Sequence, residues 1–275
     1  MRMGMRPLTA GGNRDGAVRS ELHEVVENLD FVPKRLPRQG TFPARVLLQR
    51  DGAVILTGWP VAADSAVNAA AALLGTRLRK LEQVREKTTD HGEALGLHRD
   101  GASVVVDIHD RRVHLRHPDV DYVVILCAAP APTGGQSLLV DGYRLVDRIR
   151  DQAPGLYRFL TTVDVDVTSR VPSPDVHPPP RVCRLIEWTR GGRMIVRTPD
   201  YAQPAPRETR WEEHEQQINA YADLLATLTA QARTDTTLDA GEVLVLDNYR
   251  CLHGVRAHDG TRTTHVLRCT SDGAW

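Results

Sequence analysis

The fold of this chain is decided by the stretch Gly241-Glu-Val-Leu-Val-Leu-Asp-Asn-Tyr-Arg-Cys-Leu-His-Gly254. The apolar run at 243–246 is short and rich in branched side chains, which predicts a buried strand. His253 follows soon after this strand. A histidine in such a place is more often a surface residue, or a buried residue whose hydrogen bonds are satisfied, than a metal ligand. Its function therefore depends on which residues the fold brings near it.

Outward from this stretch, short strands separated by turns alternate with helices that are gathered in blocks. This rhythm argues against a doubly wound parallel sheet and predicts an α+β protein, a β-sandwich or jelly roll with flanking helices. Strands are predicted at 46–50, 53–57, 122–128, 137–140, 186–188, 194–197 and 264–269, a hairpin at about 103–116, helices at 62–74, 143–150, 154–160 and 208–232, and an irregular proline-rich loop at 172–181.

Length and charge limit the function classes. At 275 residues the chain suits one domain, expected at 21–275 after a flexible tail at 1–20 that lacks apolar periodicity. Its 35 basic and 35 acidic residues balance, so no overall field attracts nucleic acid or an anionic membrane. The expected partner is a small molecule. The sequence does not indicate an oligomeric state.

The cysteines and the N-terminus predict a cytoplasmic protein. The four cysteines are scattered without a paired spacing, so reduced thiols are the simpler expectation than disulfides. The first residues carry charge but no apolar segment behind it, and no apolar run is long enough to span a membrane.

A second motif suggests a function for His253 as a metal ligand. In His98-Arg99-Asp100 the two outer residues are separated by one position, so on a strand they point to the same face. If the fold brings His253 to them, two imidazoles and one carboxylate form the facial triad of non-haem Fe(II) oxygenases, which leaves positions open for a bidentate cosubstrate and O2. The spacing alone is weak evidence, because His-x-Asp is common by chance.

Three segments together carry a resemblance to a known family. They are Leu97-His98-Arg99-Asp100-Gly101, Thr133-Gly-Gly-Gln-Ser-Leu-Leu-Val-Asp-Gly-Tyr143, and the stretch quoted first with the arginines that follow it. In order and rough spacing, from about Phe42 to the C-terminus, the chain resembles the Fe(II)- and 2-oxoglutarate-dependent dioxygenases of the taurine dioxygenase superfamily, especially the branch with γ-butyrobetaine and trimethyllysine hydroxylases. The resemblance implies a double-stranded β-helix core.

The resemblance also implies roles for single residues. His98, Asp100 and His253 would be the Fe(II) ligands, and the Ser137 hydroxyl would donate to the distal carboxylate of 2-oxoglutarate. Its arginine partner is left open between Arg262 and Arg268, with Arg262 favoured for 2-oxoglutarate and Arg268 for substrate or cosubstrate. Their even separation predicts one strand face for both. The implied reaction consumes 2-oxoglutarate and O2 and activates a substrate C–H bond, with hydroxylation as the default.

The neighbourhood of the triad leaves alternatives open. The hairpin at 103–116 lengthens the chain relative to taurine dioxygenase, and it is either part of the pocket mouth or a surface decoration. Its histidines are interpreted as polar-face residues. The polar residues just before the ligand strand are either substrate contacts or a solvated charged loop. The histidines of the hairpin are His109, His114 and His117. The polar residues before the ligand strand are Arg85, Thr88, Thr89, His91 and Glu93.

The substrate is the least determined part. Only three phenylalanines, four tryptophans and six tyrosines occur, too few near the motifs to predict an aromatic cage for a quaternary ammonium. The arginine supply favours an anionic or zwitterionic metabolite, such as an amino acid or a natural-product intermediate. Asp100 sets the chain apart from related halogenases, which lack the carboxylate ligand. The alternative function is a non-catalytic jelly-roll protein that binds metal or a small molecule.

Overall fold

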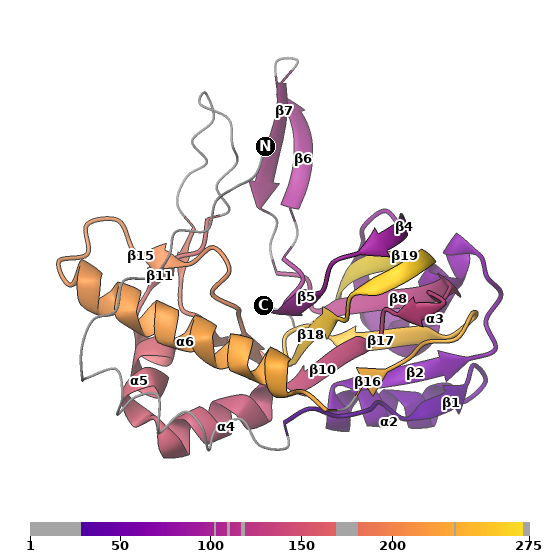
Figure 1. Cartoon of the computed structure of the whole chain (residues 1–275), viewed down its shortest axis with the longest axis horizontal. Coiled ribbons are helices and arrows are strands. Elements are labelled where there is room, and N and C mark those ends of the chain that lie inside the picture. The colour runs from indigo at the N-terminus through magenta and orange to yellow at the C-terminus, as the bar shows by residue number, and fades with distance from the viewer. Residues whose placement is uncertain are drawn as a thin grey trace.

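Two β-sheets packed face to face form the centre of the protein (Figure 1). The computed structural model describes residues 29–101, 103–108, 111–116, 119–168, 181–233 and 235–271. The expected tail at 1–20 and nearly all of the proline-rich loop at 172–181 lie outside these ranges. The two sheets confirm the jelly-roll expectation.

The larger sheet has eight strands and the smaller sheet four. The pairings in both are antiparallel, except that β1 runs parallel to β2. The larger sheet follows the order β1 (Arg35–Pro37), β2 (Ala53–Thr57), β17 (Val243–Asp247), β8 (Tyr122–Ala129), β19 (His258–Ser271) and β3 (Leu78–Leu81), with β4 (Arg85–Gly92) and β9 (Thr133–Gly134) also paired to β19. The smaller sheet follows the order β16 (Asp235–Thr236), β10 (Ser137–Asp141), β18 (Cys251–Val255) and β5 (Leu95–His98).

Strand alternation divides the apolar side chains between two faces. On β17, Val243 and Val245 pack outward beneath helices, while Leu244 and Leu246 point inward between the sheets. On β10, Leu138 joins the outer core and Leu139 the inner one. Because each strand contributes to both faces, burying both requires a cover of helices outside the sandwich.

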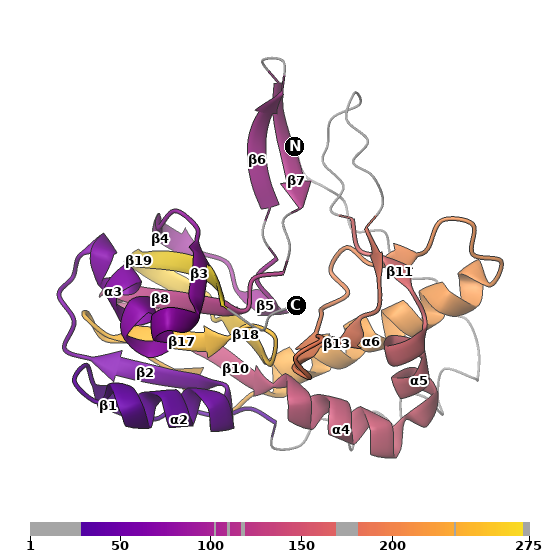
Figure 2. The same cartoon turned by 180° about the vertical axis from the view of Figure 1, so that it is seen from behind.

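Helices cover both outer faces (Figures 1 and 2). The helices α2 (Thr41–Asp51) and α3 (Ala63–Leu74) pack on the larger sheet, with the short 3-10 turn η1 (Gly75–Arg77) after α3, and α4 (Gly142–Gln152), α5 (Pro154–Thr162) and α6 (Trp211–Gln231) pack on the smaller one. None of the helices within the described ranges is both long and apolar enough to cross a membrane.

The expected strand at 46–50 is wrong, because these residues belong to α2. Ala44, Leu47 and Leu48 are buried at helical spacing against the larger sheet. Gly52 then ends the helix in the left-handed conformation (φ 83°), with its N–H donating to the Leu48 carbonyl at 3.0 Å. A short apolar run fits a strand or a helix equally. Here the segment forms a helix, whose apolar side chains cover the outer face of the larger sheet.

Smaller β-pairs surround the sandwich. The expected hairpin is present as β6 (Ser103–Ile108) and β7 (Arg111–Arg116), and it stands away from the two sheets (Figures 1 and 2). Its side chains, including those of His109, His114 and His117, lie outside what the structure describes, so its place at the pocket mouth stays a prediction. The remaining pairs are β11 (Val165–Asp166) with β12 (Val182–Cys183) and β15 (Gln203–Pro204), and β13 (Ile186–Trp188) with β14 (Met194–Val196).

Candidate metal centre and cosubstrate pocket

Two histidines from distant parts of the chain meet on neighbouring strands of the smaller sheet. His98 ends β5 and His253 lies in the middle of β18, and the two are direct partners in the antiparallel register. Their ring centroids are 4.4 Å apart. The sequence placed His253 after one strand, but the chain turns at 248–250 and enters the second sheet. This turn carries the histidine to the other side of the sandwich.

Asp100 completes the group. Its Oδ1 lies 3.9 Å from His98 Nε2, and one ligand atom from each of the three residues lies within 4.8 Å of the others. His98 Nδ1 is 2.9 Å from the Gly96 carbonyl, which only accepts, so Nδ1 carries the proton and Nε2 is free to bind a metal. The structure therefore brings the predicted triad together, and its donor set fits a divalent iron.

Burial sets the protonation states of two of these ligands. Removal from water, aided by the neighbouring His98 ring, lowers the pKa of His253 to about 4, so its imidazole is neutral near pH 7. Burial opposes ionisation of Asp100, but His253 and the contact with Arg268 outweigh it and hold the pKa of Asp100 below its usual range. A neutral imidazole and an ionised carboxylate are the forms that bind metals.

The turn after β17 holds Asp100 in place. Asn248 is fully buried, and its amide donates to the carbonyls of Asp100 (2.9 Å) and Val120 (2.8 Å). Its side-chain oxygen accepts from the Asp100 N–H at 3.1 Å. Asn248 thus binds both backbone groups of Asp100, which fixes the ligand relative to the strand that leads to His253. This explains the asparagine of the quoted stretch.

Ion pairs anchor the segments on either side of the ligands. Asp119 is buried among Arg99 (3.0 Å), Arg181 (2.7 Å) and Arg197 (2.6 Å), which come from three separate parts of the chain. Arg99 also donates to the Asn248 carbonyl at 2.9 Å. The residue between the two sequential ligands is therefore a structural anchor, which leaves His98 and Asp100 on the other side of the backbone.

Arg268 contacts the metal ligand itself. Its Nε and Nη2 donate to the two carboxylate oxygens of Asp100 at 3.0 and 3.1 Å. Burial alone would lower the pKa of Arg268, but the hydrogen bond and charge of Asp100 raise it. The structure brings Arg268 to the triad and does not bring it to Ser137. Its predicted contact with the cosubstrate stays untested, while its contact with Asp100 is a direct geometric fact.

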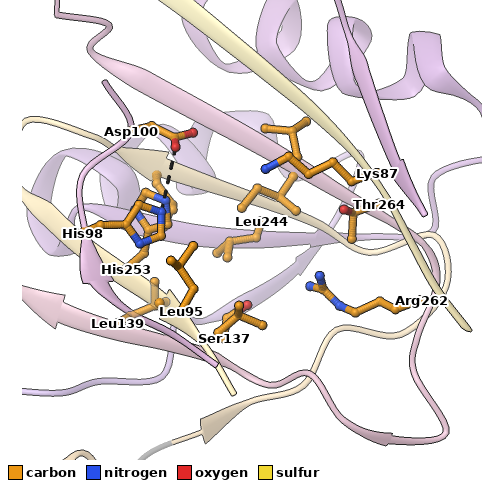
Figure 3. A pocket seen from close by; sticks show the side chains of 15 residues that line it. Lys87, Leu95, His98, Asp100, Ser137, Leu139, Leu244, His253, Arg262 and Thr264 are labelled. Carbon is orange, nitrogen blue, oxygen red and sulfur yellow. Dashed lines mark ion pairs between the residues drawn. The ribbon is translucent and has the colours of Figure 1, made fainter. Parts of the chain in front are cut away.

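A pocket opens beside the triad, between the two sheets (Figure 3). Its walls combine seven aliphatic side chains with seven polar or charged ones. The lining residues are Lys87, Leu95, His98, Asp100, Ile125, Ser137, Leu139, Leu244, Leu246, His253, Gly254, Val255, Arg262, Thr264 and Val266.

Ser137 and Arg262 lie together at the end of the pocket away from the triad (Figure 3). No described residue offers the Arg262 guanidinium a hydrogen-bonding or ion-pair partner, and burial lowers its pKa. Arg262, Thr264 and Val266 all line the pocket and Arg268 reaches Asp100, so the predicted common face of the two arginines is confirmed.

The paired glycines before Ser137 make room for this end of the pocket. Gly135 has φ +74°, and a Cβ there would lie 3.2 Å from Arg262 Cδ. A Cβ on Gly134 would lie 2.0 Å from the Ala257 carbonyl oxygen, closer than atoms can approach. Larger residues at 134 and 135 would therefore displace the backbone or the arginine.

Sequence reasoning missed Lys87 as a pocket residue. Of the polar residues named before the ligand strand, Arg85, Thr88, Thr89 and His91 lie on the strand β4, whereas Glu93 follows it. Several of them have partners elsewhere: Thr89 bonds to His258 and His91 to Asp259. Lys87, which lies between Arg85 and Thr88 on the same strand, lines the pocket. Strand periodicity could have identified it only if the pairing of β4 with β19 had been known.

Comparisons with known proteins place these features in a family context. The model of the taurine catabolism dioxygenase TauD, TfdA family matches residues 31–270. The mitochondrial trimethyllysine dioxygenase of Gallus gallus is 26% identical over 172 residues, which cover 54% of this chain and 38% of that protein. The chain therefore matches little more than a third of that relative's length.

Solved structures agree on the fold. Asparagine oxygenase in complex with Fe(II), 2S,3S-3-hydroxyasparagine and succinate superposes with a TM-score of 0.55 at 17% identity, over 85% of this chain and 78% of that chain. AAD-2 in complex with Mn(II) and N-oxalylglycine superposes with a TM-score of 0.59 at 14% identity, over 85% and 87%.

Proposed function

The chain belongs to the taurine catabolism dioxygenase TauD, TfdA family, and we propose that it is an active Fe(II)- and 2-oxoglutarate-dependent oxygenase acting on a C–H bond of a small metabolite. The observation that carries the proposal is the convergence of His98, Asp100 and His253 beside a pocket that holds Ser137 and Arg262. Hydroxylation is the simplest outcome of such a reaction. Fe(II), 2-oxoglutarate and O2 are the metal and cosubstrates of this family.

Each residue of the site has a distinct part in this proposal. His98, Asp100 and His253 hold the iron, which when bound supplies the oxidative chemistry. Arg262 and the Ser137 hydroxyl bind the distal carboxylate of 2-oxoglutarate, for which a guanidinium fork and a hydroxyl donor are suited. Arg268 orients Asp100 through its paired hydrogen bonds. The aliphatic walls exclude water from the reacting carbon.

The substrate in this proposal is a small polar, anionic or zwitterionic metabolite, such as an amino acid or a natural-product intermediate. A structural relative holds 3-hydroxyasparagine, which supports an amino-acid-sized substrate. Apart from the histidine ligands, the described lining residues include no aromatic ring, so a cage for a quaternary ammonium has no support there. A small molecule as the partner and a cytoplasmic location belong to the same proposal.

Anaerobic titration of the full chain with Fe(II) and 2-oxoglutarate tests the proposal. We expect the weak visible charge-transfer band of the chelated cosubstrate, and its loss in Asp100→Ala because one of three ligands is gone. Asp259→Ala is the matched control, since that carboxylate is exposed and, among the described residues, pairs with His91 alone. Absence of the band in the wild type would contradict the enzyme and favour the alternative, a non-catalytic jelly-roll binding protein.

A further inference from the structure

Lys87 is one of two basic side chains that line the described part of the pocket without a carboxylate partner. It lies on β4, where it pairs in register with Thr264 of β19, and Thr264 also lines the pocket. Arg262 pairs with Thr89, two positions further along β4. Because alternate residues share a face, this register turns Lys87 and Arg262 toward the same space.

The two cations occupy different parts of that space. Figure 3 shows the Lys87 amine directed from β4 toward the side of the pocket that holds the triad, while Arg262 lies with Ser137 at the other end. No described residue places a carboxylate within ion-pair distance of the Lys87 amine. Lys87 is therefore free to pair with a molecule that enters beside the triad.

The charges of the site leave this cation uncompensated even when the cosubstrate is present. Asp100 is the sole carboxylate among the described lining residues, and it already pairs with Arg268. The two negative charges of 2-oxoglutarate offset those of a divalent iron. Because Arg262 contacts the distal carboxylate of 2-oxoglutarate in this proposal, Lys87 is the lining cation that neither a described carboxylate nor the cosubstrate pairs, and its charge favours an anion over a cation beside it.

The aliphatic side chains of the same pocket define the other half of the ligand. Leu95, Leu244 and Val266 line the pocket together with the lysine and offer no polar side-chain atom. A ligand that satisfies both features has one anionic group and an aliphatic segment. Lysine suits the anionic end, because its compact ammonium approaches an anion from any direction, whereas a guanidinium requires a planar, forked arrangement.

We propose that Lys87 binds the anionic group of the substrate, and that the substrate is a small aliphatic acid whose carbon chain lies along the apolar wall toward the triad. The inference rests on the proposed function and narrows its substrate class from anionic or zwitterionic metabolites to acids with net negative charge. It also excludes a trimethylammonium group at this position.

Calorimetric titration of the full chain, loaded anaerobically with Fe(II) and 2-oxoglutarate, tests the role of Lys87. The probes are hexanoate, hexanamide and hexyltrimethylammonium, which share a chain and differ in charge. We expect hexanoate to bind the wild type about tenfold or more tightly than hexanamide, the size of one charge-assisted hydrogen bond, and hexyltrimethylammonium not to bind.

Three variants separate the lysine's charge from its bulk. Lys87→Met should abolish the preference for hexanoate, and Lys87→Arg should retain much of it. Lys34→Met, which makes the same change at an exposed lysine outside the pocket, should behave as the wild type. The dissociation constant of 2-oxoglutarate should be unchanged in Lys87→Met.

Each contrary result has a defined meaning. No preference for hexanoate in the wild type, or a preference that persists in Lys87→Met, overturns the proposal. Weaker 2-oxoglutarate binding in Lys87→Met also overturns it, because the lysine would then serve the cosubstrate. In all three cases the visible band of the wild type still forms, whereas its absence would mean that the proposed function itself has failed.

Discussion

Three basic residues near the triad differ in what they contact, although all three lie on or beside β19. Arg268 is paired with Asp100, Arg262 has no partner among the described residues and adjoins Ser137, and Lys87 adjoins the apolar wall. A basic residue whose charge is already neutralised by a metal ligand is poorly available to a cosubstrate. Contact geometry thus favours Arg262 over Arg268 for 2-oxoglutarate.

Exchanging each arginine for methionine tests this distinction. Arg262→Met should raise the 2-oxoglutarate concentration for half-maximal formation of the visible band about tenfold or more, with Fe(II) binding unchanged. Arg268→Met should instead weaken Fe(II) binding about tenfold, because Asp100 loses its orienting partner. Arg38→Met, at an exposed arginine outside the pocket, is the control. The opposite pattern would assign 2-oxoglutarate to Arg268.

At the scale of elements, the C-terminus of α2 supports the strand that carries His253. The Gly52 carbonyl accepts from the Asp247 N–H at 2.7 Å and from Cys251 Sγ at 3.2 Å. Arg250 donates to the Arg50 carbonyl at 2.6 Å. The helix that the sequence predicted as a strand therefore fixes both ends of the turn between β17 and β18.

Gly52→Ala should destabilise the protein by about 2 kcal/mol or more, because the position has φ +83° and the new Cβ would lie 2.7 Å from Cys251 Sγ. Gly155→Ala in α5 is the matched control, since a Cβ there meets nothing within 4 Å, and we expect its stability to change by less than about 1 kcal/mol. Urea unfolding measures both. Equal stability of the two variants would mean that α2 does not brace this turn.

At the scale of the whole molecule, buried charges join segments that are far apart in the chain. Asp119 connects the ends of the hairpin and of the proline-rich loop to the ligand strand through Arg99, Arg181 and Arg197. Burial opposes the ionisation of Asp119, but these cations outweigh it and hold the pKa of Asp119 well below its usual range. All four cysteines are free, as predicted, so packing and ion pairs hold these segments without disulfides.

The pH dependence of unfolding follows from His253. Its pKa is about 4 in the folded protein and near 6.5 in an unfolded chain, so between these values the unfolded state binds the extra proton. The free energy of unfolding of the metal-free protein should therefore fall by about 3 kcal/mol from this group as the pH drops from about 6.5 to about 4.

Urea unfolding across this range measures the effect, with two variants for comparison. His253→Gln should flatten the pH dependence, because glutamine does not titrate. His91→Gln, at an exposed histidine paired with Asp259, should leave it unchanged. A wild-type slope that persists in His253→Gln would assign the proton uptake to another group.

Much of the protein could be predicted from local pattern. The strands at 122–128 and 243–246, the long helix and the hairpin all depend on side-chain type and short-range period, whereas the triad was assigned from the family resemblance. The segment at 46–50 could not, since a short apolar run suits either element and only the face it covers selects one. Asn248 could not either, because its partners Asp100 and Val120 are distant in sequence.

The sequence by itself determined the chemistry available to this protein: two histidines and an aspartate in the order of a dioxygenase, a hydroxyl at 137, and a supply of cations. The tertiary structure decided how those groups are used. It paired Arg268 with Asp100, left Arg262 beside Ser137 without a partner among the described residues, and placed the exposed Lys87 in the lining of the pocket. The physical reason is register, since the alignment of β4 with β19 is set by the packing of whole sheets, and a shift by one residue would turn Lys87 away from the pocket.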